Sequence, residues 1–113
     1  MHELAITNNM LDIVLKEAEK AEAKQVGRIT LVIGEMTGVV ADSVQFYFDF
    51  LSKGTPAEGA TLLFTMVPIR AQCRGCDKFF ETKELDWICP YCGNNSLEII
   101  AGKELFVESI EVE

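Results

Sequence analysis

The sequence lacks three features that would each indicate a broad class of protein. Its apolar runs fall short of the roughly 18 residues that a membrane-spanning helix needs, and the opening Met1-His2-Glu3 carries no basic segment of the secretory type. Basic residues are also few, since ten Lys and Arg stand against eighteen Asp and Glu. The net charge of −8 repels phosphate backbones and anionic lipids. We therefore expect a cytoplasmic protein that binds neither nucleic acid nor a membrane.

Histidine is equally scarce, because the only one is His2. No serine or cysteine elsewhere has a histidine to serve as its base, so the sequence predicts a protein that is not an enzyme. Apolar residues nevertheless make up 49% of the 113 residues, which predicts a packed interior. The length fits one ordinary domain, or a small domain with a metal-held insert.

Hydrophobic periodicity predicts two helices and three strands. Apolar residues recur at helical spacing over residues 4–23, and a second helix follows the first strand. Alternation of apolar and polar residues predicts strands over residues 28–35, 61–67 and 105–112. Each element has one apolar side, so they can share a single core.

The second helix is predicted to open at Asp42, which forms a capping box with Gln45. Its buried stripe, at helical spacing, consists of Val44, Tyr47, Phe48 and Leu51. Phe46 and Phe50 lie off this stripe, where they either broaden the buried face or leave an apolar patch for a partner. We expect burial.

These elements predict an α+β fold, with a small three-stranded sheet that carries two helices on one face. A zinc-ribbon-like four-cysteine knob is inserted before the last strand. The predicted domains are residues 1–67 with 103–113, which form the α/β body, and residues 68–102, which form the knob.

The four cysteines form two CxxC pairs, Cys73/Cys76 and Cys89/Cys92, with twelve residues between them. In a reducing compartment this spacing indicates metal ligands rather than disulfides. Four thiolates predict one tetrahedral structural zinc ion with no open position for water. A rubredoxin-like iron centre uses similar turns and stays open as an alternative. Between the pairs we expect only a brief hairpin, from residues 79–80 to residues 87–88.

The chain start offers a different set of ligands. The Met1 amine, the His2 amide nitrogen and the His2 imidazole can form fused rings around one ion, a planar nitrogen set that suits Ni(II) or Cu(II) better than Zn(II). Glu3 adds a carboxylate or an amide nitrogen. The residues alone leave two other readings open: His2 as a solvated side chain, and Glu3 as a charge that complements the helix dipole.

Taken together, four features resemble the HypA/HybF family of nickel metallochaperones for nickel–iron (NiFe) hydrogenase maturation. They are the opening Met1-His2-Glu3-Leu4, the Ile33-Gly34-Glu35 at the end of the first strand, the Ala57-Glu58-Gly59-Ala60 within residues 54–60, and the two cysteine pairs. The resemblance covers essentially the whole chain, and the combination is specific although each motif alone is common.

The resemblance implies a nickel site in the α/β body and zinc on the cysteines. In the family the Met-His-Glu opening binds nickel, so His2 is the expected key ligand, with Met1 and Glu3 beside it. Some members also use an aspartate after the first strand, for which Asp42 is the nearest match. The implied partners are a HypB-like GTPase and the hydrogenase large-subunit precursor, and some relatives also serve urease. A monomer and a homodimer are both compatible.

A competing hypothesis is a zinc-ribbon module that binds nucleic acid or a protein partner. Basic and aromatic residues do interleave near the knob, as Arg70, Arg74, Lys78 and Lys83 with Phe79, Phe80, Trp87 and Tyr91. The acidic balance of the chain argues against it. A rubredoxin-like electron carrier is the third hypothesis.

Overall fold

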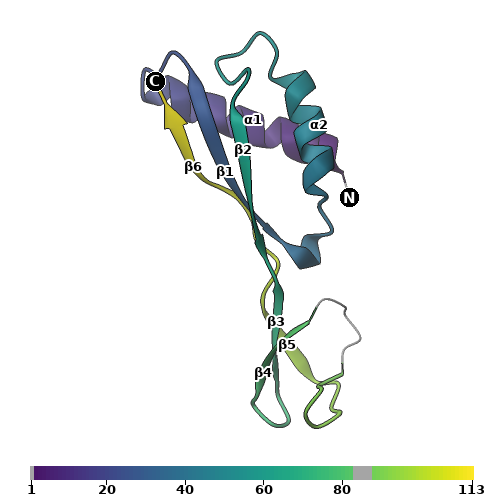
Figure 1. The fold of residues 1–113 in the computed structure, drawn as a ribbon. Coiled ribbons are helices and arrows are strands. Elements are labelled where there is room, and N and C mark those ends of the chain that lie inside the picture. The colour runs from purple at the N-terminus through teal and green to yellow at the C-terminus, as the bar shows by residue number, and fades with distance from the viewer. Residues whose placement is uncertain (1, 83–87) are drawn as a thin grey trace.

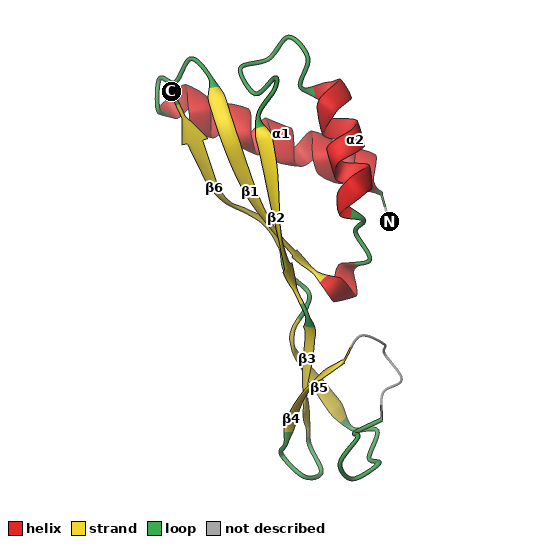
Figure 2. Ribbon diagram, viewed as in Figure 1, coloured by secondary structure: helices red, strands yellow, loops and turns green. Residues whose placement is uncertain are grey.

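The computed structural model describes residues 2–82 and 88–113, which form two small sheets and two main helices (Figures 1 and 2). The elements are α1 (Glu3–Lys20), β1 (Val26–Gly34), the 3-10 helix η1 (Glu35–Thr37), α2 (Ala41–Leu51), β2 (Thr61–Val67), β3 (Ile69–Cys73), β4 (Phe79–Thr82), β5 (Leu97–Ala101) and β6 (Leu105–Val112). The molecule is elongated, with principal extents of 55 × 24 × 17 Å. Within the described part of the chain, no helix combines the length and apolar character needed to cross a bilayer.

The first sheet has the strand order β2-β1-β6 and forms the wider end of the molecule in Figure 1. β1 pairs in parallel with β2 and antiparallel with β6, and the parallel connection passes through α2. Both helices and the inward residues of β1 and β2 contribute to one hydrophobic core. Its most deeply buried side chains include Val14, Val26, Ile29, Ile33 and Phe48. The predicted α+β fold class is confirmed.

A second three-stranded sheet, β4-β3-β5, occupies the narrow end of the molecule. The chain enters it from β2 and returns from it to β6, and β3 pairs antiparallel with both neighbours. The brief hairpin expected between residues 79–80 and 87–88 falls largely outside the described residues, which leave out 83–87, and stays a prediction. β4 pairs with β3, Ile88 lies in no strand, and Trp87 falls outside the described residues.

The two sheets join where three backbone segments meet closely. The Gly34 N–H donates to the Glu104 carbonyl at 2.6 Å, and the Met36 N–H donates to the Gly102 carbonyl at 2.8 Å. A Cβ atom on Gly34 would collide with the Gly102 carbonyl, so only glycine fits there. Gly102 itself has a φ of +113° and lies against Ile69. The end of β1 and the η1 segment thus bind the backbone of residues 102–104, which leads from the second sheet back to β6.

Two predictions about α2 are wrong. The helix begins at Ala41 with Val40 as N-cap and has no side-chain capping bond; the Gln45 amide instead donates to the Asp49 carboxylate at 2.8 Å. Phe46 and Phe50, which we expected to be buried, are 70% and 69% exposed. At 100° per residue they point away from Val44 and Phe48, which belong to the core that both helices share with the sheet.

The two faces of α2 predict opposite effects of the same substitution. Phe48→Ala removes a side chain that is 1% exposed in the core and should lower the free energy of unfolding by about 3–5 kcal/mol. Phe46→Ala, on the exposed side of the same helix, should change it by no more than about 0.5 kcal/mol. Urea unfolding followed by circular dichroism measures both, and equal effects would contradict the placement of the helix.

Candidate metal centre

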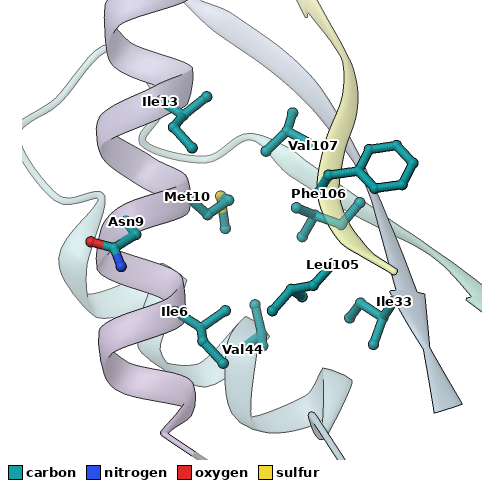
Figure 3. A pocket seen from close by; sticks show the side chains of 10 residues that line it. Ile6, Asn9, Met10, Ile13, Ile33, Val44, Leu105, Phe106 and Val107 are labelled. Atoms are coloured by element: carbon teal, nitrogen blue, oxygen red, sulfur yellow. The ribbon is translucent and has the colours of Figure 1, made fainter. Parts of the chain in front are cut away.

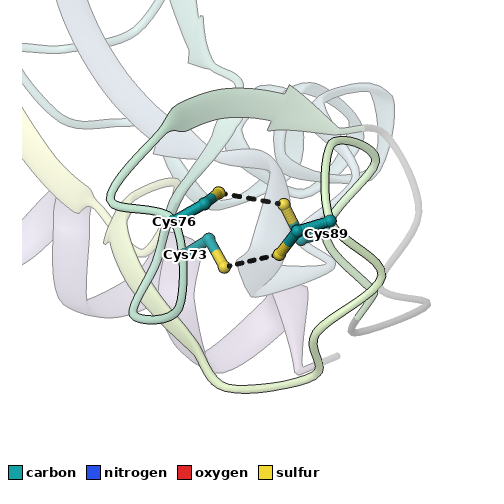
Figure 4. A group of neighbouring side chains, drawn as sticks. Cys73, Cys76 and Cys89 are labelled. Carbon is teal, nitrogen blue, oxygen red and sulfur yellow. Dashed lines mark hydrogen bonds between the residues drawn. The ribbon is translucent and has the colours of Figure 1, made fainter.

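The four cysteine sulfurs gather at the far end of the second sheet (Figure 4). All lie within 4.8 Å of one another, a spacing that can hold a single metal ion. The Cys73 and Cys92 sulfurs are 3.5 Å apart, and the Cys76 and Cys89 sulfurs are 3.7 Å apart. Cys73 and Cys89 are buried, whereas Cys92 is exposed at the surface. The structure thus brings together all four predicted ligands from two separate turns.

The two cysteine turns repeat the same backbone geometry. In each turn, the N–H two residues after the first cysteine donates to its sulfur, from Gly75 at 3.3 Å and from Tyr91 at 3.4 Å. The N–H four residues after it donates to its carbonyl, from Asp77 at 2.8 Å and from Gly93 at 2.9 Å. Both of these residues have positive φ, 60° at Asp77 and 75° at Gly93. N–H groups aimed at sulfur stabilise thiolates, so the donor set fits a thiolate-bound metal such as Zn(II).

The thiols of this cluster influence one another's ionisation. Burial raises the pKa of Cys89, but N–H groups of Tyr91 and Cys92 and the neighbouring thiols outweigh it and lower the pKa to about 7. The Asn94 N–H lowers the pKa of Cys92, yet contacts with the other thiols and burial raise it to about 12. The Lys78 N–H lowers the pKa of Cys76, but burial and the Cys73 and Cys89 thiols outweigh it and raise the pKa above its ordinary value. One thiolate forms readily, and its charge then opposes the next.

Metal binding at this cluster should therefore be steeply pH-dependent. With the pKa values of Cys76 and Cys92 raised above their ordinary value, both thiols are protonated at pH 7 and must lose a proton to bind metal. Each displaced proton contributes about tenfold per pH unit, so zinc should bind at least about a hundredfold more tightly at pH 7.5 than at pH 6.5. Competition with a chromophoric chelator measures the slope. A change of less than tenfold would contradict this thiol cluster, and the His2→Ala variant should give the same slope as the wild type.

The other predicted ligands lie at the opposite end of the molecule. His2 is the N-cap residue of α1 and is exposed, and its carbonyl accepts the Ile6 N–H at 3.1 Å. The Glu3 carboxylate accepts the Val40 N–H at 3.1 Å, which lowers its pKa and keeps it ionised to lower pH than an ordinary glutamate. Met1 falls outside the described residues. In the described chain, no group of three or more potential ligand side chains contains His2, Glu3 or Asp42.

Sequence reasoning missed the contact between Glu3 and Val40. The Val40 N–H is a backbone group at the start of α2, 37 residues away from Glu3, and its side chain gives no sign of the bond. The contact ties the first turn of α1 to the beginning of α2. It shows that the Glu3 carboxylate is already engaged with a second element.

An apolar hollow of about 170 Å³ separates α1 from β6 (Figure 3). Ile6, Met10 and Ile13 approach it from α1, while Leu105 and Val107 approach it from β6. Among the described residues that line it, Asn9 is the only polar one. The hollow therefore has no set of side chains that could hold a metal ion.

Comparison with known proteins places these observations in context. Residues 1–112 match the family model described as hydrogenase/urease nickel incorporation, metallochaperone, hypA. The chain is 46% identical over 114 residues to the hydrogenase maturation factor HypA of Caldanaerobacter subterraneus, and the match covers both proteins completely. It is 47% identical over 113 residues to the factor of the same name from Dehalococcoides mccartyi, covering 100% of this chain and 95% of that protein.

Two solved structures are similar to this chain. One is the solution structure of the Ni metallochaperone HypA from Helicobacter pylori, with a TM-score of 0.66, 20% identity, and coverage of 99% of this chain and 97% of that chain. The other is described as the solution structure of HypA protein, with a TM-score of 0.72, 22% identity, and coverage of 100% and 97%. At these identities the similarity concerns the fold.

Proposed function

The chain belongs to the HypA family of metallochaperones for nickel incorporation, which are maturation factors and not enzymes, and on that premise we propose the details of its activity. It binds Ni(II) through Met1, His2 and Glu3 and delivers the ion to the NiFe-hydrogenase large-subunit precursor. The observation that carries this proposal is the match to the family model, which begins at residue 1 and so includes the Met-His-Glu opening.

The position of His2 supports a delivery site. Its side chain is exposed at the N-cap of α1, where the first N–H groups of the helix have no partner within the helix. An amine, an amide nitrogen and an imidazole in succession offer the planar set that Ni(II) favours. Such a site is shallow, so an acceptor with more ligands can remove the ion. The bond from the Val40 N–H to the Glu3 carboxylate orients this end of the chain.

We further propose that Cys73, Cys76, Cys89 and Cys92 hold a structural Zn(II) ion. Support comes from the four sulfurs within 4.8 Å and from the two matched turns, whose N–H groups point at sulfur. In this proposal residues 68–102 are the zinc-binding domain, and residues 1–67 with 103–113 are the nickel-binding domain. Elemental analysis distinguishes zinc from the iron of a rubredoxin-like centre.

The proposed partners follow from the family. A HypB-like GTPase and the hydrogenase large-subunit precursor are the proteins with which we expect this chain to work. We place that work in the cytoplasm, since thiols that serve as metal ligands require a reducing compartment. A monomer and a homodimer both fit these roles.

Nickel transfer tests the central proposal. Purified untagged protein is loaded with nickel, analysed for zinc, iron and nickel, and mixed with the large-subunit precursor in the presence of a chelator that captures free nickel. We expect about one nickel and one zinc per chain, and nickel that reaches the precursor despite the chelator. If the chelator takes all the nickel before the precursor does, the carrier proposal is wrong.

The competing nucleic-acid module receives little support from the second sheet. The Arg70 guanidinium lies over the Phe79 ring at 5.4 Å, and the Lys78 ammonium lies over the Tyr91 ring at 4.8 Å. Each of these rings therefore has a cation of the same chain on one face, where a base would otherwise stack. Salt-sensitive retention on immobilised nucleic acid would favour that alternative after all.

A further inference from the structure

Two phenylalanines form an apolar patch on the solvent side of α2. Phe46 and Phe50 stand one helical turn apart, and at 70% and 69% exposure they are the most exposed large hydrophobic side chains among the described residues. The Phe46 ring also meets the Tyr47 ring edge to face, with 5.4 Å between centroids. Neither phenylalanine contributes to the core. Closely spaced, exposed aromatic rings of this kind are typical of the anchors of protein–protein interfaces.

The patch lies close to the end of the chain that carries the proposed nickel site. α2 packs on α1, and its N-cap residue Val40 is hydrogen-bonded to the Glu3 carboxylate. Figure 1 shows α2 at the margin of the molecule, beside the N-terminus. Leu4 and Val40, in the same region, are also about half exposed, at 51% and 52%. A protein bound to α2 would therefore lie next to His2.

Charge determines which kind of partner fits. Asp42 precedes Phe46 by one turn, and Asp49 precedes Phe50 by one residue, so both carboxylates lie along the exposed side of the same helix. A second copy of this chain would bring the same two aspartates to the contact, together with a net charge of −8. Like charges facing each other disfavour that dimer. A cationic partner is favoured, because Lys and Arg can pair with the aspartates and lie over the aromatic rings.

We propose that Asp42, Phe46, Asp49 and Phe50, the α2 face, form the docking surface for a basic amphipathic helix of a partner protein. The apolar side of that helix packs on the two rings, and its Lys and Arg residues contact the two carboxylates. The identity of the partner rests on the proposed function, which makes it the GTPase or the large-subunit precursor. A protein docked on the α2 face, whether the large-subunit precursor or the GTPase, lies beside the proposed nickel ligands.

The test measures binding of the full-length chain to each of these two proteins, together with nickel binding by the same samples. One variant carries Phe46→Ser and Phe50→Ser, and a second carries Asp49→Lys. Asp42 stays unchanged, because it is the nearest match to the aspartate that some family members use at the nickel site. The matched control is Ile13→Ser, which changes another helical residue that is 52% exposed but lies at the apolar hollow beside β6. Sedimentation of the wild type determines whether the chain associates with itself.

We expect the double serine variant to lose at least about tenfold in affinity for one of the two proteins. The Asp49→Lys variant should also lose affinity, by a smaller factor, and should flatten the dependence of affinity on salt. Ile13→Ser should bind as the wild type does, and all variants should bind nickel normally.

Three outcomes would overturn this docking surface. They are unchanged binding of the double serine variant, loss of binding in Ile13→Ser instead, and a wild-type dimer that the double serine variant converts to monomer. Nickel binding separates the two proposals. If the wild type binds no nickel but the double serine variant loses partner binding, the carrier proposal is wrong and the docking surface stands. If the wild type binds nickel normally but the double serine variant still binds both partners, the docking surface is wrong and the carrier proposal stands.

Discussion

Replacing His2 with alanine is expected to weaken nickel binding by roughly a hundredfold or more, which corresponds to about 2.7 kcal/mol. The change removes the imidazole, which closes the second ring of the proposed planar chelate and is the only such group in the chain. The fold should be unaffected, because the His2 side chain is exposed and the hydrogen bond from the Ile6 N–H is accepted by the His2 backbone carbonyl, which alanine also provides. Nickel titration by calorimetry measures the effect, and zinc content should stay at the wild-type level.

Two further variants make this result specific to the chain start. One extra residue ahead of Met1 moves the amine away from the imidazole and should weaken nickel binding as strongly as His2→Ala. Asn8→Ala changes another exposed polar residue of α1 and should have no effect. Equal nickel affinity in the wild type, His2→Ala and the extended chain would show that nickel binds elsewhere.

Periodicity was sufficient to predict the elements that surround the main core. The strands β2 and β6 have the predicted limits, and α1 ends at Lys20, three residues before the predicted end. These elements each have one apolar side and one polar side, and the burial of the apolar side decides their structure. The grouping of the four cysteines also followed from their spacing, because a CxxC turn is a local structure.

The second sheet could not be predicted in the same way. β4 and β5 contain four and five residues, and none of these nine side chains is buried. Such strands show no strong apolar face, and they exist because they pair with β3 on either side. The contact between Glu3 and the Val40 backbone was hidden for a related reason, since it depends on how α1 and α2 are packed. The exposure of Phe46 and Phe50 shows that apolar character alone does not predict burial.

The second sheet has little hydrophobic core of its own. This leads to the other prediction with a large expected effect. Within residues 68–82 and 88–102, the buried side chains are those of Ile69, Ala71, Cys73 and Cys89, so two of the four belong to proposed metal ligands. No residue of this part contributes to the main hydrophobic core. Units this small are commonly stabilised by a disulfide or a metal ion, and structural zinc supplies about 10–16 kcal/mol in comparable peptides.

Cys73→Ser is therefore expected to lose the proposed zinc ion and to unfold the second sheet, while the first sheet with its two helices stays folded. Cys73 is fully buried and ends β3, the central strand, so both the ligand and the pairing of β4 and β5 depend on it. Hydrogen exchange measures the result residue by residue: amides of β3 and β5 should lose protection, and those of β1 should keep it. Asn95→Ser, an exposed change near the second cysteine turn, is the matched control and should retain zinc and protection. Persistent protection of β3 in zinc-free Cys73→Ser would mean that strand pairing alone maintains this sheet and that the metal has another role.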